Sequence, residues 1–196
     1  MQKYKIVFWS EKSDSGTTCN MYAVAAVLAL KYHYKMTAEK QGKIFLSDGK
    51  IMLTIMDCGA GMGLYAKKQL ESADLIAINF RQVPHMLDFL FTDYAGISDR
   101  LVYFISSYHK DSIYHKKYIY RYYRITPERL GVIPYNPEFQ MACSRGRAAA
   151  YVRGKDSLDT TDRREYFFEE LERAVEMLLR NLDNTSTVED KGRILL

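Results

Sequence analysis

The stretch that most constrains the fold of this chain is a polar segment, Ser10 to Asn20, that separates two apolar runs. It reads SEKSDSGTTCN, follows KIVFW and precedes MYAVAAVLAL. A short apolar run bounded by polar residues is typical of a buried strand, and a longer one is typical of a buried helix. The pattern therefore predicts a strand over Lys5–Trp9, a glycine-containing loop, and a helix from Thr18 to about Tyr34.

This strand–loop–helix unit is the setting of a phosphate-binding loop. Such a loop directs backbone N–H groups and a helix N-terminus toward one point, and Gly16 allows the backbone conformations that bring those donors close. The Walker A motif GxxxxGK[ST] is kept only in part, because Thr17 replaces its lysine. Thr18 takes the place of the hydroxyl residue that binds a nucleotide-bound magnesium ion. A plain turn with a threonine N-cap is the open alternative.

A second motif, DCGAG, follows the apolar run Ile51–Met56. Asp57 at the end of a predicted strand suits a Walker B role, in which the carboxylate holds magnesium or its water shell. Gly61 could present a backbone N–H to a γ-phosphate. Ligands of parallel α/β sheets bind beyond the carboxyl ends of the strands, where both motifs would lie. The alternative is that Asp57 caps the following helix.

Strand-like and helix-like segments alternate along the chain, which predicts an α/β fold with a mostly parallel sheet flanked by helices and a C-terminal helix. An Asp-Gly turn after Ser47 predicts a hairpin. Asp162 and Glu165 predict a capping box at the start of the last helix. The predicted strands are Lys5–Trp9, Ile44–Leu46, Ile51–Asp57, Leu75–Phe80, Leu101–Ile105 and Val132–Pro134. Further helices are predicted at Leu64–Ser72, from Pro84 through Met86, Leu87, Phe89 and Leu90, in a Tyr-rich segment, and from about Asp162.

The length of 196 residues predicts a single domain, residues 1–183, with a polar tail, residues 184–196. No apolar run approaches the roughly 20 residues that span a bilayer, and the N-terminus lacks the features of a signal peptide. The three cysteines are widely spaced and show no metal-binding pattern. We therefore expect reduced thiols in a cytoplasmic protein. The four histidines show no metal or triad spacing, and we assign them no chemistry.

In their order, these motifs resemble the MinD/ParA class of P-loop ATPases, whose deviant Walker A reads KGGxGK[ST]. With Gly16 on the last glycine of that motif, Lys12 falls on the signature lysine, Thr17 on the Walker lysine and Thr18 on the magnesium threonine. DCGAG matches the second-strand aspartate and switch motif. ESADLIAIN resembles the following strand, and GVIPYNPEFQMACSRG resembles the segment near the nucleotide base. These segments cover most of residues 3–150.

The resemblance implies a three-layer P-loop fold that binds ATP and magnesium. Lys12 would reach across a homodimer to the partner's phosphates, and Ser106 falls where the class often has a base-contacting asparagine. The alternatives are an exposed surface lysine and, for Pro134 to Asn136, a rigid loop after an edge strand. The nucleotide-binding residues implied are Lys12, Ser15, Gly16, Thr17, Thr18 and Gly61, with Pro134, Tyr135 and Asn136 at the base and with Thr18 and Asp57 at the magnesium ion.

One region departs from that class. There, the first helix leads to a strand that ends in a further aspartate, and a long insertion precedes the Walker B strand. In this chain only YKMTAEKQG and a few more residues separate the predicted first helix from the strand that ends in Asp57, and we predict no such strand among them. Because that region resembles the one that supplies the catalytic aspartate, we expect hydrolysis to be slow or absent.

Residues 108–124, YHKDSIYHKKYIYRYYR, interleave cations with aromatic residues. Between His109 and Arg129 lie six basic and two acidic residues, which account for the whole net charge of +4. Such a segment can bind single-stranded nucleic acid, but an amphipathic helix with extended Lys and Arg side chains explains it more simply. The leading hypothesis is a nucleotide-responsive or scaffolding protein. The alternative is a non-enzymatic adaptor that binds nucleic acid or a protein through residues 108–124.

Overall fold

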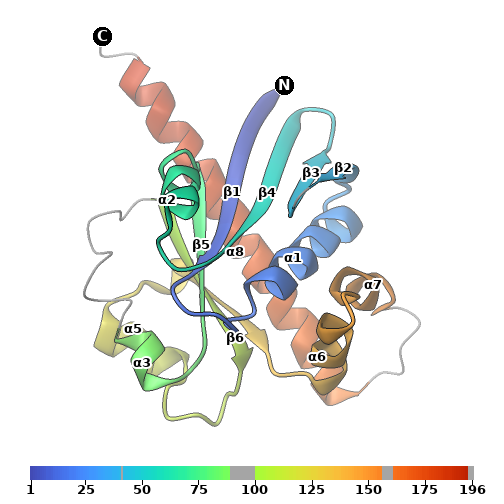
Figure 1. Ribbon diagram of the computed structural model, residues 1–196, viewed down its shortest axis with the longest axis vertical. Helices are drawn as coiled ribbons and strands as arrows, with labels where there is room; N and C mark the ends of the chain where they lie inside the picture. The colour runs from blue at the N-terminus through green and yellow to red at the C-terminus, as the bar shows by residue number, and fades with distance from the viewer. Residues whose placement is uncertain (41, 89–99, 156–160, 194–196) are drawn as a thin grey trace.

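A computed structural model describes residues 1–40, 42–88, 100–155 and 161–193, the last nine of these by their backbone alone (Figure 1). Within these residues one seven-stranded sheet has the order β2-β3-β4-β1-β5-β6-β7. Strands β4, β1, β5, β6 and β7 are parallel, whereas β2 and β3 run antiparallel at one edge. The strands are β1 (Gln2–Ser10), β2 (Lys35–Lys40), β3 (Lys43–Ser47), β4 (Ile51–Ala60), β5 (Leu75–Phe80), β6 (Leu101–Tyr108) and β7 (Leu130–Pro134).

Helices cover both faces of the sheet, which makes three layers (Figure 1). On one face pack α1 (Thr17–Lys31), α6 (Pro137–Ser144), α7 (Ala148–Arg153) and α8 (Asp162–Arg193). On the other face pack α2 (Leu64–Glu71), α3 (Pro84–Leu87) and α5 (Lys116–Tyr123), and a short 3-10 turn, η2 (Pro127–Arg129), precedes β7. The predicted fold class, a mostly parallel sheet between helices with a C-terminal helix, is confirmed.

Each face of the sheet has its own hydrophobic core, and the side chains of β1 alternate between the two. Ile6 and Phe8 enter the core beneath α1 and α8, whereas Val7 and Trp9 enter the core beneath α2 and α5. Because successive side chains of a strand point to opposite faces, a central strand buried on both sides is apolar throughout. All six residues of β5 are buried for the same reason. The parallel strands thus end at one edge of the sheet, and the loops that follow them gather there.

Most predicted elements are present, including the hairpin of β3 and β4 and the buried face of α8. Three elements, β2, α6 and α7, were not predicted, and the backbone of α8 continues to Arg193. The predicted capping box is replaced by Thr161, whose Oγ1 accepts a hydrogen bond from the Arg164 N–H at 3.4 Å. Phe89 and Leu90 lie outside the described residues.

Candidate nucleotide-binding site

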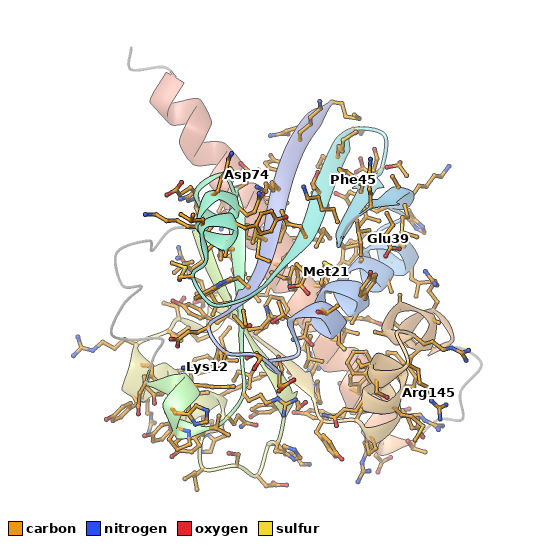
Figure 2. The ribbon with its side chains drawn as sticks, in the orientation of Figure 1. Lys12, Met21, Glu39, Phe45, Asp74 and Arg145 are labelled. Atoms are coloured by element: carbon orange, nitrogen blue, oxygen red, sulfur yellow. The ribbon has the colours of Figure 1, made fainter. Side chains whose placement is uncertain are left out.

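The loop between β1 and α1 lies at the carboxyl-terminal edge of the sheet, as the position of Lys12 in Figure 2 shows. Asp74, at the start of β5, lies at the opposite edge. Gly16 is the N-cap of α1, with φ of 78°, and no side chain caps the helix. The backbone N–H groups of Thr17 and Thr18 lie in the first turn of α1, where the helix itself supplies no acceptor. These donors are free to bind an anion.

Three hydroxyl side chains form hydrogen bonds within the β1–α1 loop. The hydroxyls of Ser10 and Ser15 both donate to the Lys12 carbonyl, at 2.9 and 2.8 Å. The Thr17 hydroxyl donates to Ser10 Oγ at 3.1 Å. Ser10, Ser15 and Thr17 are buried, whereas Lys12 is exposed. The loop is therefore shaped by its own hydroxyl groups, and the side chain at the Walker lysine position brings no charge.

Thr18 and Asp57 meet across the loop. The Thr18 hydroxyl donates to Asp57 Oδ2, and Asp57 Oδ1 accepts the Gly59 N–H at 2.7 Å. Asp57 lies within β4 rather than at its end, since β4 continues to Ala60. A hydroxyl and a carboxylate are the oxygen donors that Mg²⁺ prefers, and such sites are completed by phosphate and water. Among the described residues no group of three or more His, Cys, Asp or Glu side chains is placed to hold a metal ion, so a metal ion here would need the phosphates.

Gly61 is already engaged with β1. Its N–H donates to the Ser10 carbonyl at 2.9 Å, and its carbonyl accepts the Trp9 indole N–H at 2.8 Å. A contact between the Gly61 N–H and a phosphate would require the first of these hydrogen bonds to be exchanged. The segment after β4 is thereby tied to the beginning of the β1–α1 loop.

A buried polar network lies beneath the loop, and sequence reasoning missed it. Asn20 Nδ2 donates to Asn79 Oδ1 at 2.8 Å and to Ser106 Oγ at 2.7 Å. Asn79 Nδ2 donates to the carbonyls of Trp9 and Ala77. The network joins α1 to the ends of β1, β5 and β6. Its signal in the sequence is an asparagine within the apolar run LIAINF, since a buried polar side chain in a strand requires partners.

Beyond the ends of β5, β6 and β7 lies a cavity of about 480 Å³. Tyr135 is 37% exposed at this cavity, and its ring stacks on His109 at 4.7 Å between centroids. Pro134 and Asn136 are buried, and Asn136 Oδ1 accepts the Phe139 N–H at 2.9 Å as the N-cap of α6. The lining residues are Arg81, Gln82, Val83, Ser106, Ser107, His109, Ser112, Tyr135 and Gln140. Of the three residues predicted at the base, only Tyr135 lines this cavity.

Two cysteines near the loop interact with each other. A hydrogen bond with the Cys143 thiol of α6 lowers the pKa of Cys19, in the first turn of α1, and the same hydrogen bond raises the pKa of Cys143. Cys58, next to Asp57, has its pKa raised to about 11 by burial. All three thiols are free, as the spacing of the cysteines predicted.

Comparison with known proteins identifies no close relative. No protein family and no curated protein matches this chain. Among solved structures, the FeoB G-domain from Methanococcus jannaschii matches with a TM-score of 0.33 and 9% sequence identity, over 76% of this chain and 99% of that chain. These values do not assign a family. Among the described helices, none combines the length and the apolar character needed to cross a membrane.

Proposed function

We propose that this protein binds a nucleotide with magnesium at the β1–α1 loop and acts as a nucleotide-responsive or scaffolding component. The observation that carries the proposal is the contact of Thr18 with Asp57, at the N-terminus of α1, where the N–H groups of the first turn have no acceptor within the helix. The N–H groups would bind the phosphates, and Thr18 and Asp57 would hold the magnesium ion. Descent from the MinD/ParA class and a preference for ATP are parts of this proposal.

Hydrolysis, if any, would be slow. A bound magnesium ion would draw charge from the phosphates, but Thr17 replaces the lysine that usually adds to this effect. Loss of one preorganised charged donor removes several kcal/mol of transition-state stabilisation. In the region from which the resemblance implies a catalytic aspartate, β2 carries one acidic residue, Glu39. Its carboxylate accepts the Tyr22 hydroxyl at 2.5 Å.

Calorimetric titration of the full chain with ATP and magnesium tests the proposal. We expect saturable heat and a rise in melting temperature that both shrink when EDTA removes magnesium, because ligand that binds only the folded state stabilises it. No heat and no thermal shift at millimolar ATP would refute nucleotide binding. Light scattering with and without ATP tests the homodimer, in which exposed Lys12 would reach the partner's phosphates.

A second candidate function is an adaptor that uses α5, and one observation favours it. The rings of Tyr118 and Tyr122 stack at 5.3 Å and 12°, and Tyr122 is 67% exposed. Lys117 and Arg121 are exposed on the same helix, whereas Ile119 and Tyr123 are buried. The helix is therefore amphipathic, as predicted, and its outer face combines aromatic rings with positive charge. Stacked bases and backbone phosphates suit such a face.

Fluorescence anisotropy with a single-stranded oligonucleotide tests this second candidate. Binding that weakens steeply with salt and that disappears when Lys117 and Arg121 are both changed to glutamate would support it. Lys116 is unsuitable for charge reversal, because its Nζ pairs with the buried Glu170 carboxylate at 2.5 Å. An oligonucleotide affinity that the two substitutions leave unchanged would refute the nucleic-acid role of α5.

A further inference from the structure

The proposed phosphate loop has no buried cation of its own. Thr17 is buried and uncharged, and Lys12 is exposed on the outer part of the loop. A polyphosphate carries several negative charges, and donors that are themselves charged bind it most strongly. A cation that belongs to another element of the fold could supply this interaction.

The register of the sheet places Arg81 next to the loop. Phe80 pairs with Ile105, so Arg81 and Ser106 each follow that pair by one residue. Ser106 in turn lies against the phosphate loop, since a Cβ atom on Gly16 would be 3.1 Å from Ser106 Cβ. Arg81, just beyond the end of β5, is therefore next to Ser106 of β6. Ser106 in turn lies close to Gly16, the N-cap of α1.

Arg81 also lines the cavity beyond β5, β6 and β7, together with Ser106 and Tyr135. None of the nine residues that line this cavity is acidic. In the described part of the chain no carboxylate pairs with Arg81. The volume of about 480 Å³ is in the range of small-molecule sites. The cavity therefore offers an exposed cation and an aromatic ring without a competing negative charge.

We propose that Arg81 binds the phosphate chain of a nucleoside diphosphate or triphosphate, in place of the lysine that Thr17 replaces. A guanidinium group presents paired donors that match two phosphate oxygens. The nucleoside occupies the adjoining cavity beside Tyr135. This inference rests on the nucleotide-binding function proposed above and adds to it the residue that recognises the charge.

Titration with ATP and with adenosine tests the inference. Arg81→Gln removes the charge and shortens the side chain, whereas Arg81→Lys keeps the charge. Arg153→Gln is the matched control, because Arg153 is an exposed arginine on α7 that does not line the cavity. We expect Arg81→Gln to weaken ATP binding at least about tenfold, since hydrogen bonds to charged groups are the stronger ones. Arg81→Lys should retain part of the affinity, and adenosine binding should change little.

The outcomes separate this inference from the proposed function. Wild-type protein that does not bind ATP would overturn both. Wild-type binding with equal ATP affinities in Arg81→Gln and Arg153→Gln would overturn the role of Arg81 alone. An equal loss for ATP and adenosine would also overturn it, because the charge would then not be what Arg81 recognises. Urea midpoints of the variants establish that each is folded.

Discussion

The hydroxyl of Thr18, in the first turn of α1, donates a hydrogen bond to the carboxylate of Asp57 on β4. The two residues are 39 positions apart in the sequence, and parallel pairing of β1 with β4 brings them together. Phe8 pairs with Asp57 in that register. The contact joins the two motifs that the sequence analysis assigned to phosphate and magnesium.

Removal of the Asp57 carboxylate should abolish the magnesium dependence of nucleotide binding. In Asp57→Ala we expect the affinity for ATP with magnesium to fall about tenfold, toward the value measured in EDTA, because one of two protein oxygen ligands is lost. Calorimetry in both buffers measures the difference. Asp183→Ala, an exposed aspartate on α8, is the control. A variant at Asp57 that keeps the full magnesium effect would contradict the assigned role.

Gly16→Ala should destabilise the protein more than the same change in a turn. Both Gly16 and Gly49 have positive φ, 78° and 95°, which costs an alanine about 1–2 kcal/mol. Only at Gly16 does the new methyl group meet a neighbour, Ser106 Cβ at 3.1 Å, whereas Gly49 has nothing within 4 Å. We expect an additional loss of about 1 kcal/mol or more from this crowding. Urea unfolding of the two variants measures their free energies of unfolding. Equal losses would show that Ser106 moves away from the new methyl group without cost.

Gly131→Ala should loosen the packing of β7 against α8. A Cβ atom at Gly131 would lie 2.9 Å from both Ala174 Cβ and Met177 Cε. Met177 can move its terminal methyl group, but Ala174 cannot, so the helix must shift at a cost of about 1–3 kcal/mol. Gly63→Ala is the matched control, since nothing lies within 4 Å of that position. A drop in urea midpoint confined to Gly131→Ala supports this packing; similar midpoints argue against it.

The ion pair between α6 and α8 should make stability depend on pH. Arg164 donates to both oxygens of Glu138, from Nη2 at 2.6 Å and from Nε at 2.8 Å. This hydrogen bonding, with a further one from the Tyr151 hydroxyl, lowers the pKa of Glu138 below its usual value of 4.5. A lowered pKa in the folded state means that folding favours the ionised form, so the stabilisation is complete above about pH 4.5 and is lost as pH falls through the folded pKa.

Urea unfolding between pH 7 and pH 3 tests this dependence. We expect Glu138→Gln to lower the free energy of unfolding at pH 7, and we expect the difference from the wild type to shrink as pH falls through the lowered pKa of Glu138. The contribution is modest because the pair is partly exposed to solvent. A difference between the two proteins that stays constant over the whole range would mean that the charge of Glu138 is not involved.

The parts of the fold that sequence reasoning identified are those with a strong local signal. Strands β1, β5 and β6 are apolar because they are buried on both faces, and α1 follows from the apolar run after Gly16. Strand β2 was missed because all six of its residues are exposed at the sheet edge, so KMTAEK carries no burial pattern. The helices α6 and α7 were missed because α6 buries one residue, Phe139, and α7 buries two, Ala148 and Val152, so neither shows a clear apolar period.

The candidate site divides in the same way. Lys12, Gly16, Thr18 and Asp57 could be singled out because a motif in the sequence marks each of them. Asn20 and Arg81 could not, since each acquires its place only through residues on other strands or helices, and the one signal for Asn79 was an asparagine in an apolar run. Of Pro134, Tyr135 and Asn136, which the resemblance places at the nucleotide base, Tyr135 lines the cavity and Asn136 caps α6.

By itself, the sequence determined the alternation of strands and helices and the position of a glycine loop between the first strand and the first helix. These are local properties, set by hydrophobic period and by backbone conformation at Gly16. Only the tertiary structure decided that Thr18 meets Asp57, that Ser106 lies against Gly16, and that Arg81 faces the cavity next to them. Strand order and register set those distances, and they follow from the packing of the whole sheet rather than from any one segment.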